Sequence, residues 1–186
     1  MAWQLDKAHT HLSFTVRHLM VTNVRGQFED LDVKVDFNDE DLAKSSVVAT
    51  IKAASIDTRF ADRDAHLRSA DFLDAEHYPE LTFKSKNVVL NGRNKGRIIG
   101  DLTIRDVTKE VVLDVEYTGV IKNPMGSQSA GFNAHTTIKR QDWGLVWNVA
   151  LEAGGMLVGD DVKIEIELEL VKVPEAAPVT ANQQNS

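Results

Sequence analysis

Residues 162–170, VKIEIELEL, decide the fold class of this 186-residue chain. Every second residue from Val162 to Leu170 is Val, Ile or Leu, and the residues between them are Lys163 and three glutamates. Successive side chains of a β-strand point to opposite faces, so this alternation predicts a long strand with one apolar and one solvated face. A helix would distribute the same glutamates around its circumference. The stretch therefore favours an all-β fold.

The same period of two returns along most of the chain. Further alternating segments occupy residues 11–18, 33–37, 47–51, 81–85, 98–105, 111–118 and 130–138. Turn-forming pairs such as Asn91-Gly92 and Gly154-Gly155 lie between segments and predict hairpins, which make a sheet antiparallel. Strands of roughly ten residues are long for a sandwich, and closure removes exposed sheet edges. We therefore predict an extended eight-stranded antiparallel barrel of the lipocalin type.

Two segments depart from the alternation. Residues 59–74, RFADRDAHLRSADFLD, have apolar residues at helical spacing, with Asp62 and Asp64 at a suitable helix start and Thr58 as a candidate cap. They predict a short helical insert between strands. Residues 174–186, PEAAPVTANQQNS, contain little that could be buried, so we expect a disordered C-terminal tail after a folded domain at residues 1–173.

Composition excludes several classes of function. The 28 acidic residues outnumber the 21 basic ones, giving a net charge of −7, which argues against a nucleic-acid-binding protein. The absence of cysteine excludes disulfides, thiolate metal sites and a cysteine nucleophile. No apolar run approaches the ~18 residues of a spanning helix, and no secretory leader is visible, so we expect no membrane insertion. The expected location is cytoplasmic, or periplasmic if the chain is a mature form.

Several motifs, in order, are similar to those of a known family. They are DKAHT (6–10), VRGQF (24–28), DRDAHL (62–67), SADFL (69–73), YPELTFKS (78–85), GDLTIRDVTK (100–109), RQDWGL (140–145) and VGDDV (158–162). Together they resemble the YceI-like polyisoprenoid-binding family over roughly residues 3–172. The resemblance implies a lipocalin-like barrel whose lumen holds a long isoprenoid, such as a polyprenyl or quinone tail, or another amphiphile. The chain would then store or transport this lipid without catalysis or a cofactor.

Candidate lining residues follow from the apolar faces of the strands and from large groups late in the chain. We expect a lipid ligand to contact Phe14, Val16, His18, Phe28, Phe83, Leu102, Ile104, Phe132, Trp143 and Trp147. Small inward residues could leave room for the ligand, and these are Ala49, Gly100, Ala130 and Ala134. The pattern alone is equally compatible with a cavity and with a packed core.

Other functions remain open from the residues alone. His9 and His11 could ligate a metal if a third ligand converged, but ordinary polar side chains at a strand start are the favoured interpretation. Asp64 and His66 could act as an acid–base pair on a bound amphiphile, although a structural role of this cluster is favoured. A third alternative is a ligand-free structural barrel, which could form a homodimer through a strand face. We assign no catalytic and no metal-binding residues.

Overall fold

Eleven strands form one antiparallel sheet within residues 2–173, the part of the chain that the computed structural model describes. The strands are β1 (Ala2–Leu5), β2 (His11–His18), β3 (Thr22–Phe28), β4 (Leu31–Asp36), β5 (Ser46–Lys52), β6 (Ile56–Asp57), β7 (Glu80–Leu90), β8 (Lys95–Ile104), β9 (Val107–Lys122), β10 (Gln128–Lys139) and β11 (Val158–Val173). The helices are α1 (Ala61–Arg68) and the 3-10 turns η1 (Lys7–His9), η2 (Leu42–Lys44), η3 (Ala53–Ser55) and η4 (Arg140–Trp143).

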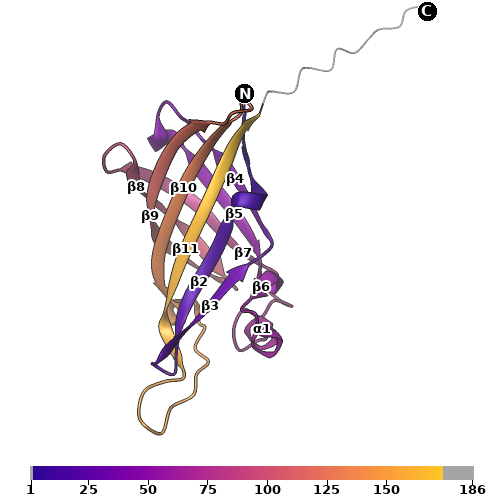
Figure 1. Cartoon of the computed structure of the whole chain (residues 1–186). Helices are drawn as coiled ribbons and strands as arrows, with labels where there is room; N and C mark the ends of the chain where they lie inside the picture. The colour runs from indigo at the N-terminus through magenta and orange to yellow at the C-terminus, as the bar shows by residue number, and fades with distance from the viewer. Residues whose placement is uncertain (1, 174–186) are drawn as a thin grey trace, which may run out of the picture.

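The sheet closes into a barrel with eight strand positions (Figure 1). Three positions consist of two short strands each. In the first position β1 and β2 both pair with β11. In the second position only Glu29 and Asp30 separate β3 from β4, and in the third η3 separates β5 from β6. The β3–β6 and β4–β5 ladders join the second position to the third, and β7 to β11 complete the ring. The predicted eight-stranded antiparallel barrel is therefore confirmed, with interruptions that raise the number of separate strands.

The helical insert is also confirmed, as the single α-helix of the described residues. Helix α1 lies at the lower end of the barrel in Figure 1, beside β6. The expected Thr58 cap is wrong, because the residue before the helix is Phe60, and the Thr58 hydroxyl donates to the side chain of Asp64 instead of accepting from a backbone N–H of the first turn. The predicted disordered tail, residues 174–186, lies outside the described residues. No helix between residues 2 and 173 is long and apolar enough to cross a membrane.

Buried side chains divide into two groups along the barrel. The larger group fills the lower part and includes Phe83, Leu102, Ile104 and Trp143. The smaller one consists of Phe37, Ala130 and Leu170 with partly buried neighbours, at the end where β1 and β11 pair. Both groups also contribute side chains to the wall of an internal cavity, such as Phe83 and Leu102 from the larger group and Phe37 from the smaller one.

Candidate ligand-binding cavity

The barrel encloses a cavity of about 490 Å³, within the range typical of ligand sites. Every long strand contributes inward side chains to its wall. From β11 these side chains belong to Val158 and to four apolar residues of the alternating pattern, Val162, Ile164, Ile166 and Leu168. Ten residues of strand span roughly 33 Å, so the wall accommodates a long and narrow apolar molecule. The structure thus favours a cavity over a solid core.

All but one of the ten predicted lining residues border this cavity. They are Phe14, Val16, His18, Phe28, Phe83, Leu102, Ile104, Phe132 and Trp147. Trp143 lies elsewhere: its side chain is buried, and its indole Nε1 donates a hydrogen bond to the carbonyl oxygen of Leu102 at 3.0 Å. Because this bond satisfies the indole N–H inside the wall, Trp143 stabilises the barrel rather than facing a ligand.

Only two of the four small inward residues leave room in the cavity. Ala49 and Ala134 border it, on β5 and β10. A Cβ at Gly100 would lie 2.5 Å from the Phe83 ring, so this glycine permits close packing of a neighbouring side chain. Ala130 is completely buried in the smaller group of packed residues. Ala49 and Ala134 are therefore the two small predicted residues that face the cavity.

Aromatic rings border the cavity at its upper end. Phe37 packs edge-on against Tyr117 and Phe132, with ring centroids 5.8 and 5.3 Å apart, and Trp3 packs on its other side at 5.2 Å. Phe37, Tyr117 and Phe132 all line the cavity. Burial raises the pKa of the Tyr117 phenol, so the phenol stays neutral at neutral pH. An apolar tail would meet aromatic rings here, with Arg93 and Lys95 of the turn between β7 and β8 also on the cavity wall.

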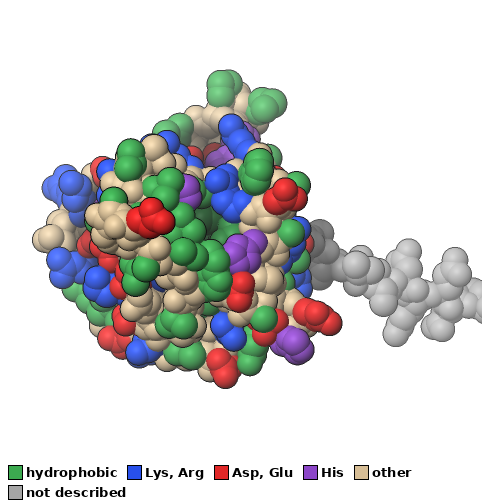
Figure 2. Space-filling view, turned by 90° about the horizontal axis from the view of Figure 1, so that it is seen from below, with side chains coloured by type: hydrophobic (Ala, Val, Ile, Leu, Met, Phe, Trp, Pro, Cys, Tyr) green, Lys and Arg blue, Asp and Glu red, His purple; other side chains and the backbone are tan. Residues whose placement is uncertain are grey.

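The lower end of the barrel is hollowed, as Figure 2 shows, with hydrophobic side chains inside the hollow. The segment at residues 144–157 and α1 meet at this end. Trp147 packs against His66 of α1 and against Phe72, with ring centroids 4.5 and 5.4 Å apart. All three side chains line the cavity. We call this end the mouth.

Arg140 holds the segment 144–157 in place. Its side chain is 4% exposed, and its guanidinium donates to the carbonyl oxygens of Leu145, Trp147 and Gly159 at 2.6, 3.0 and 2.9 Å. Burial lowers the pKa of this guanidinium, but arginine remains charged inside proteins. Gly144 reverses the chain with a φ of +79°, a conformation that favours glycine. This accounts for the Arg and Gly of the RQDWGL motif.

The charged side chains that line the cavity are all basic or histidine. No Asp or Glu of the described residues takes part, although the chain carries a net charge of −7. At the mouth these residues are Arg17, His18, Arg63, His66 and Arg140, and the turn between β7 and β8 adds Arg93, Lys95 and Arg97. Acidic side chains are instead found on the outward faces of strands, such as the glutamates of β11. The cavity is therefore suited to an apolar tail with a neutral or anionic head.

Asp64 and His66 do not pair with each other. The buried Asp64 carboxylate accepts hydrogen bonds from the backbone N–H of Thr58 at 2.8 Å and from its hydroxyl at 2.5 Å. His66 Nε2 lies 2.8 Å from Asp71 Oδ2 instead. These contacts fix α1 to the preceding strand, which matches the structural interpretation of this cluster.

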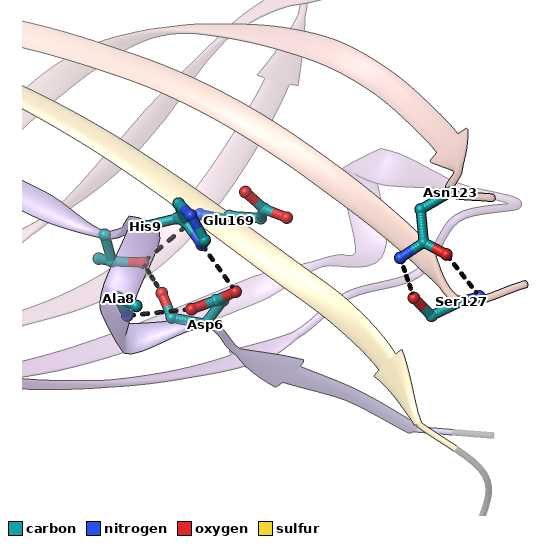
Figure 3. A network of polar contacts seen from close by, with 7 residues as sticks. Asp6, Ala8, His9, Asn123, Ser127 and Glu169 are labelled. Carbon is teal, nitrogen blue, oxygen red and sulfur yellow. Dashed lines mark hydrogen bonds and ion pairs between the residues drawn. The ribbon is translucent and has the colours of Figure 1, made fainter. Parts of the chain in front are cut away.

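A second polar cluster lies outside the cavity, where η1 interrupts the first strand position (Figure 3). One ligand atom from each of Asp6, His9 and Glu169 lies within 4.8 Å of the others. The hydrogen bond between His9 and Asp6 raises the pKa of the His9 imidazole and lowers that of the carboxyl. His11, the other member of the predicted histidine pair, does not belong to this cluster. His135 faces Asp114 on β9 at 3.9 Å.

Sequence reasoning missed lining residues on strands with a weaker pattern. Val33 and Val35 on β4, and Leu113 and Val115 on β9, all border the cavity. Each pair is separated by one outward residue, so the same alternation would have identified them. Arg17 and Arg140 carried no comparable signal, because an arginine on a strand or turn is usually solvated.

The fold and the cavity together define a lipocalin-like barrel with an internal site for an apolar ligand. Comparison with known families identifies the chain more closely, since the YceI-like domain matches residues 3–170. The chain therefore belongs to the YceI-like domain family. A UPF0312 protein of Staphylococcus epidermidis is 42% identical over 168 residues, covering 90% of this chain and 95% of the relative. A UPF0312 protein of Staphylococcus aureus is 42% identical over 165 residues, 88% and 94% of the two chains.

Solved structures agree with this assignment. The Campylobacter jejuni YCEI protein has a TM-score of 0.72 and 35% identity, with 94% of this chain and 99% of that chain covered. BcnA of Burkholderia cenocepacia has a TM-score of 0.74 and 26% identity, covering 89% and 99%. A polyisoprenoid binding domain from Saccharophagus degradans has a TM-score of 0.60 at 14% identity, covering 94% and 99%, which shows a shared fold.

Proposed function

We propose that this protein binds a long-chain isoprenoid, such as a polyprenyl chain or an isoprenoid quinone, or a similar amphiphile, inside the barrel. It would store or transport this lipid without changing it chemically. The observation that carries the proposal is the long apolar cavity, whose charged lining residues are basic or histidine. Membership of the YceI-like family and the shared fold with a structure described as a polyisoprenoid binding domain support it.

Burial of the tail supplies the binding free energy. Each CH₂ group removed from water contributes about 0.8 kcal/mol, so an apolar wall can hold a long tail without many polar contacts. The proposed tail contacts are the predicted lining residues other than Trp143, with Phe132 at the upper end and His18 at the mouth. Arg63 and His66 at the mouth are the proposed contacts of the head group, because both side chains reach the cavity wall there.

A lumen-blocking variant tests the proposal. Ala134→Trp places an indole on the inner wall of the cavity, whereas His135→Trp places the same side chain on the outer wall of the same strand. If the indole excludes four CH₂ groups of the tail, affinity falls by about 3 kcal/mol, or roughly 200-fold. Ala49→Trp, from β5, provides a second blocking variant in case Ala134→Trp folds poorly.

The measurement has two parts. Native mass spectrometry of gently purified protein identifies a co-purified lipid, and titration with a fluorescent polyprenyl analogue gives affinities for folded variants. We expect tight binding for the unmodified protein and His135→Trp, and weak binding for both blocking variants. An unmodified protein that carries no lipid and ignores the analogue would overturn the proposal, as would equal affinities for all variants.

A further inference from the structure

Two turns project from the barrel beside the mouth (Figure 1), and both carry exposed apolar side chains. The turn between β2 and β3 carries Leu19, Met20 and Val21, which are 43%, 62% and 71% exposed. The segment 144–157 carries Val149 and Met156, which are about half exposed. We call these five residues the apolar tip. Single exposed apolar residues are ordinary, but five gathered at one place on two turns indicate an interaction surface.

The two turns form one unit. The backbone N–H of Leu19 donates to the carbonyl oxygen of Leu157 at 2.9 Å. Met20 lies directly over Gly155, where a Cβ would come within 2.1 Å of its sulfur. Gly155 has a φ of +90°, so glycine is required here both by its conformation and by this close approach. The chain therefore fixes the apolar tip in position rather than leaving two independent loops.

Backbone strain indicates that this exposure has a function. Leu19 and Met20 have φ values of +53° and +58°, a conformation that is uncommon for bulky residues and is usually taken by Gly or Asn in turns. Strained residues cluster at functional sites, where the surrounding structure holds them. A turn with glycine or asparagine at these positions would relieve the strain and would expose no apolar side chain. The sequence instead keeps two large side chains in a strained turn that exposes them.

We propose that the apolar tip inserts into a lipid bilayer and brings the mouth to the membrane surface for exchange of the ligand. The inference rests on the proposed function, because a ligand with a long apolar tail resides in membranes. Continuity supports it: Leu157, whose carbonyl oxygen bonds to the tip, also lines the cavity. An apolar path thus leads from the tip into the barrel. Arg17 and His18, at the base of the β2–β3 turn, would face the lipid phosphates.

The size of the tip favours a bilayer over a protein partner. Five side chains, each about half exposed, offer on the order of 250 Å² of apolar surface. A stable protein interface buries about 800 Å² on each partner and requires a complementary shape. A bilayer needs no fixed complement, because its chains adapt to a narrow apolar projection.

Flotation with vesicles of phosphatidylcholine tests the proposal, using lipid-stripped protein. Met20→Glu and Val21→Glu place a carboxylate in the tip, and Met125→Glu makes the same change at the opposite end of the barrel, where Met125 is 91% exposed. We expect the unmodified protein and Met125→Glu to float with the vesicles. We expect each tip variant, with an unchanged melting temperature, to lose at least ten-fold in vesicle partitioning.

The outcomes separate this proposal from the proposed function. Ala134→Trp should still float with vesicles, because its tip is intact, although it takes up little ligand. Failure of the unmodified protein to float, or an equal loss for Met125→Glu, overturns the membrane proposal even if the barrel binds lipid in solution. A homodimer that dissociates on Met20→Glu while no form binds vesicles also overturns it, because the tip would then be a protein interface.

Discussion

Replacement of Arg140 by methionine should destabilise the barrel strongly. Three hydrogen bonds of 3.0 Å or less join its guanidinium to the carbonyl oxygens of Leu145, Trp147 and Gly159, and a longer one of 3.4 Å reaches Val158. A hydrogen bond to a charged group contributes about 1.5–3 kcal/mol, so three contribute roughly 4–9 kcal/mol. Relief of the buried charge and the apolar contacts of methionine offset part of this sum.

The net loss expected for Arg140→Met is therefore about 3–5 kcal/mol, the range typical when one partner of a buried charged contact is removed. For a domain of this size, 1 kcal/mol lowers the melting temperature by about 2–4 °C, so the expected decrease is about 6–20 °C. Thermal unfolding followed by circular dichroism measures it. Hydrogen exchange should show that residues 144–157 lose protection first, because the guanidinium holds their carbonyl groups.

Lys139→Met is the matched control. This substitution also removes a positive charge, at the neighbouring position. The Lys139 amine, however, pairs on the surface with the Asp161 carboxylate 3.0 Å away, and both side chains are about 60% exposed. Such pairs contribute about 0–1 kcal/mol, so the control should melt within about 3 °C of the unmodified protein. If Arg140→Met melts at the same temperature as Lys139→Met, the role assigned to the guanidinium is wrong.

Two further changes test the assignments of individual side chains. Trp143→Phe removes the donor to the buried Leu102 carbonyl and should lower the free energy of unfolding, measured in urea, by about 1–3 kcal/mol. Lipid uptake should be retained. Loss of uptake at full stability would instead place Trp143 in the binding site. Asp6→Asn should lower the pKa of His9 toward its ordinary value in an NMR titration and leave that of His77, which pairs with another aspartate, unchanged. The pKa of His9 is higher in the folded state than in the unfolded state. Its pairing with Asp6 therefore stabilises the fold fully at a pH below the unfolded-state pKa of His9, and this stabilisation is lost as the pH rises through the folded-state pKa.

The barrel could be predicted because its long strands are half-buried. From Val162 to Leu170 of β11 each inward residue is apolar and each outward residue is charged, so periodicity alone defines the strand and its faces there. The interruptions at η1 and η3 could not be predicted in the same way. The backbone N–H of Ala53, for example, donates to the carbonyl oxygen of Pro79, a partner 26 residues away. A contact of this kind leaves no local pattern in the sequence.

The two late tryptophans show where prediction of the site fails. Trp143 and Trp147 are four residues apart, and both are large apolar groups near the expected last strand. In the structure η4 points Trp143 into the wall, and the left-handed turn at Gly144 carries the chain around so that Trp147 reaches the mouth. Side-chain type was the same for both residues, so only the path of the backbone distinguishes a wall residue from a cavity residue.

The alternation that defines the fold also separates the charges. On β11 the inward positions are apolar and the glutamates point outward, so each added outward carboxylate raises the net negative charge without placing an acid in the lumen. The same alternation holds around the eight strand positions. The chain therefore has a net charge of −7, yet no Asp or Glu of the described residues lines the cavity. The basic and histidine side chains act locally, at the mouth and in the turn between β7 and β8. The acidic composition, which argues against nucleic acid as a partner, is thus compatible with an anionic or neutral head group on a bound lipid.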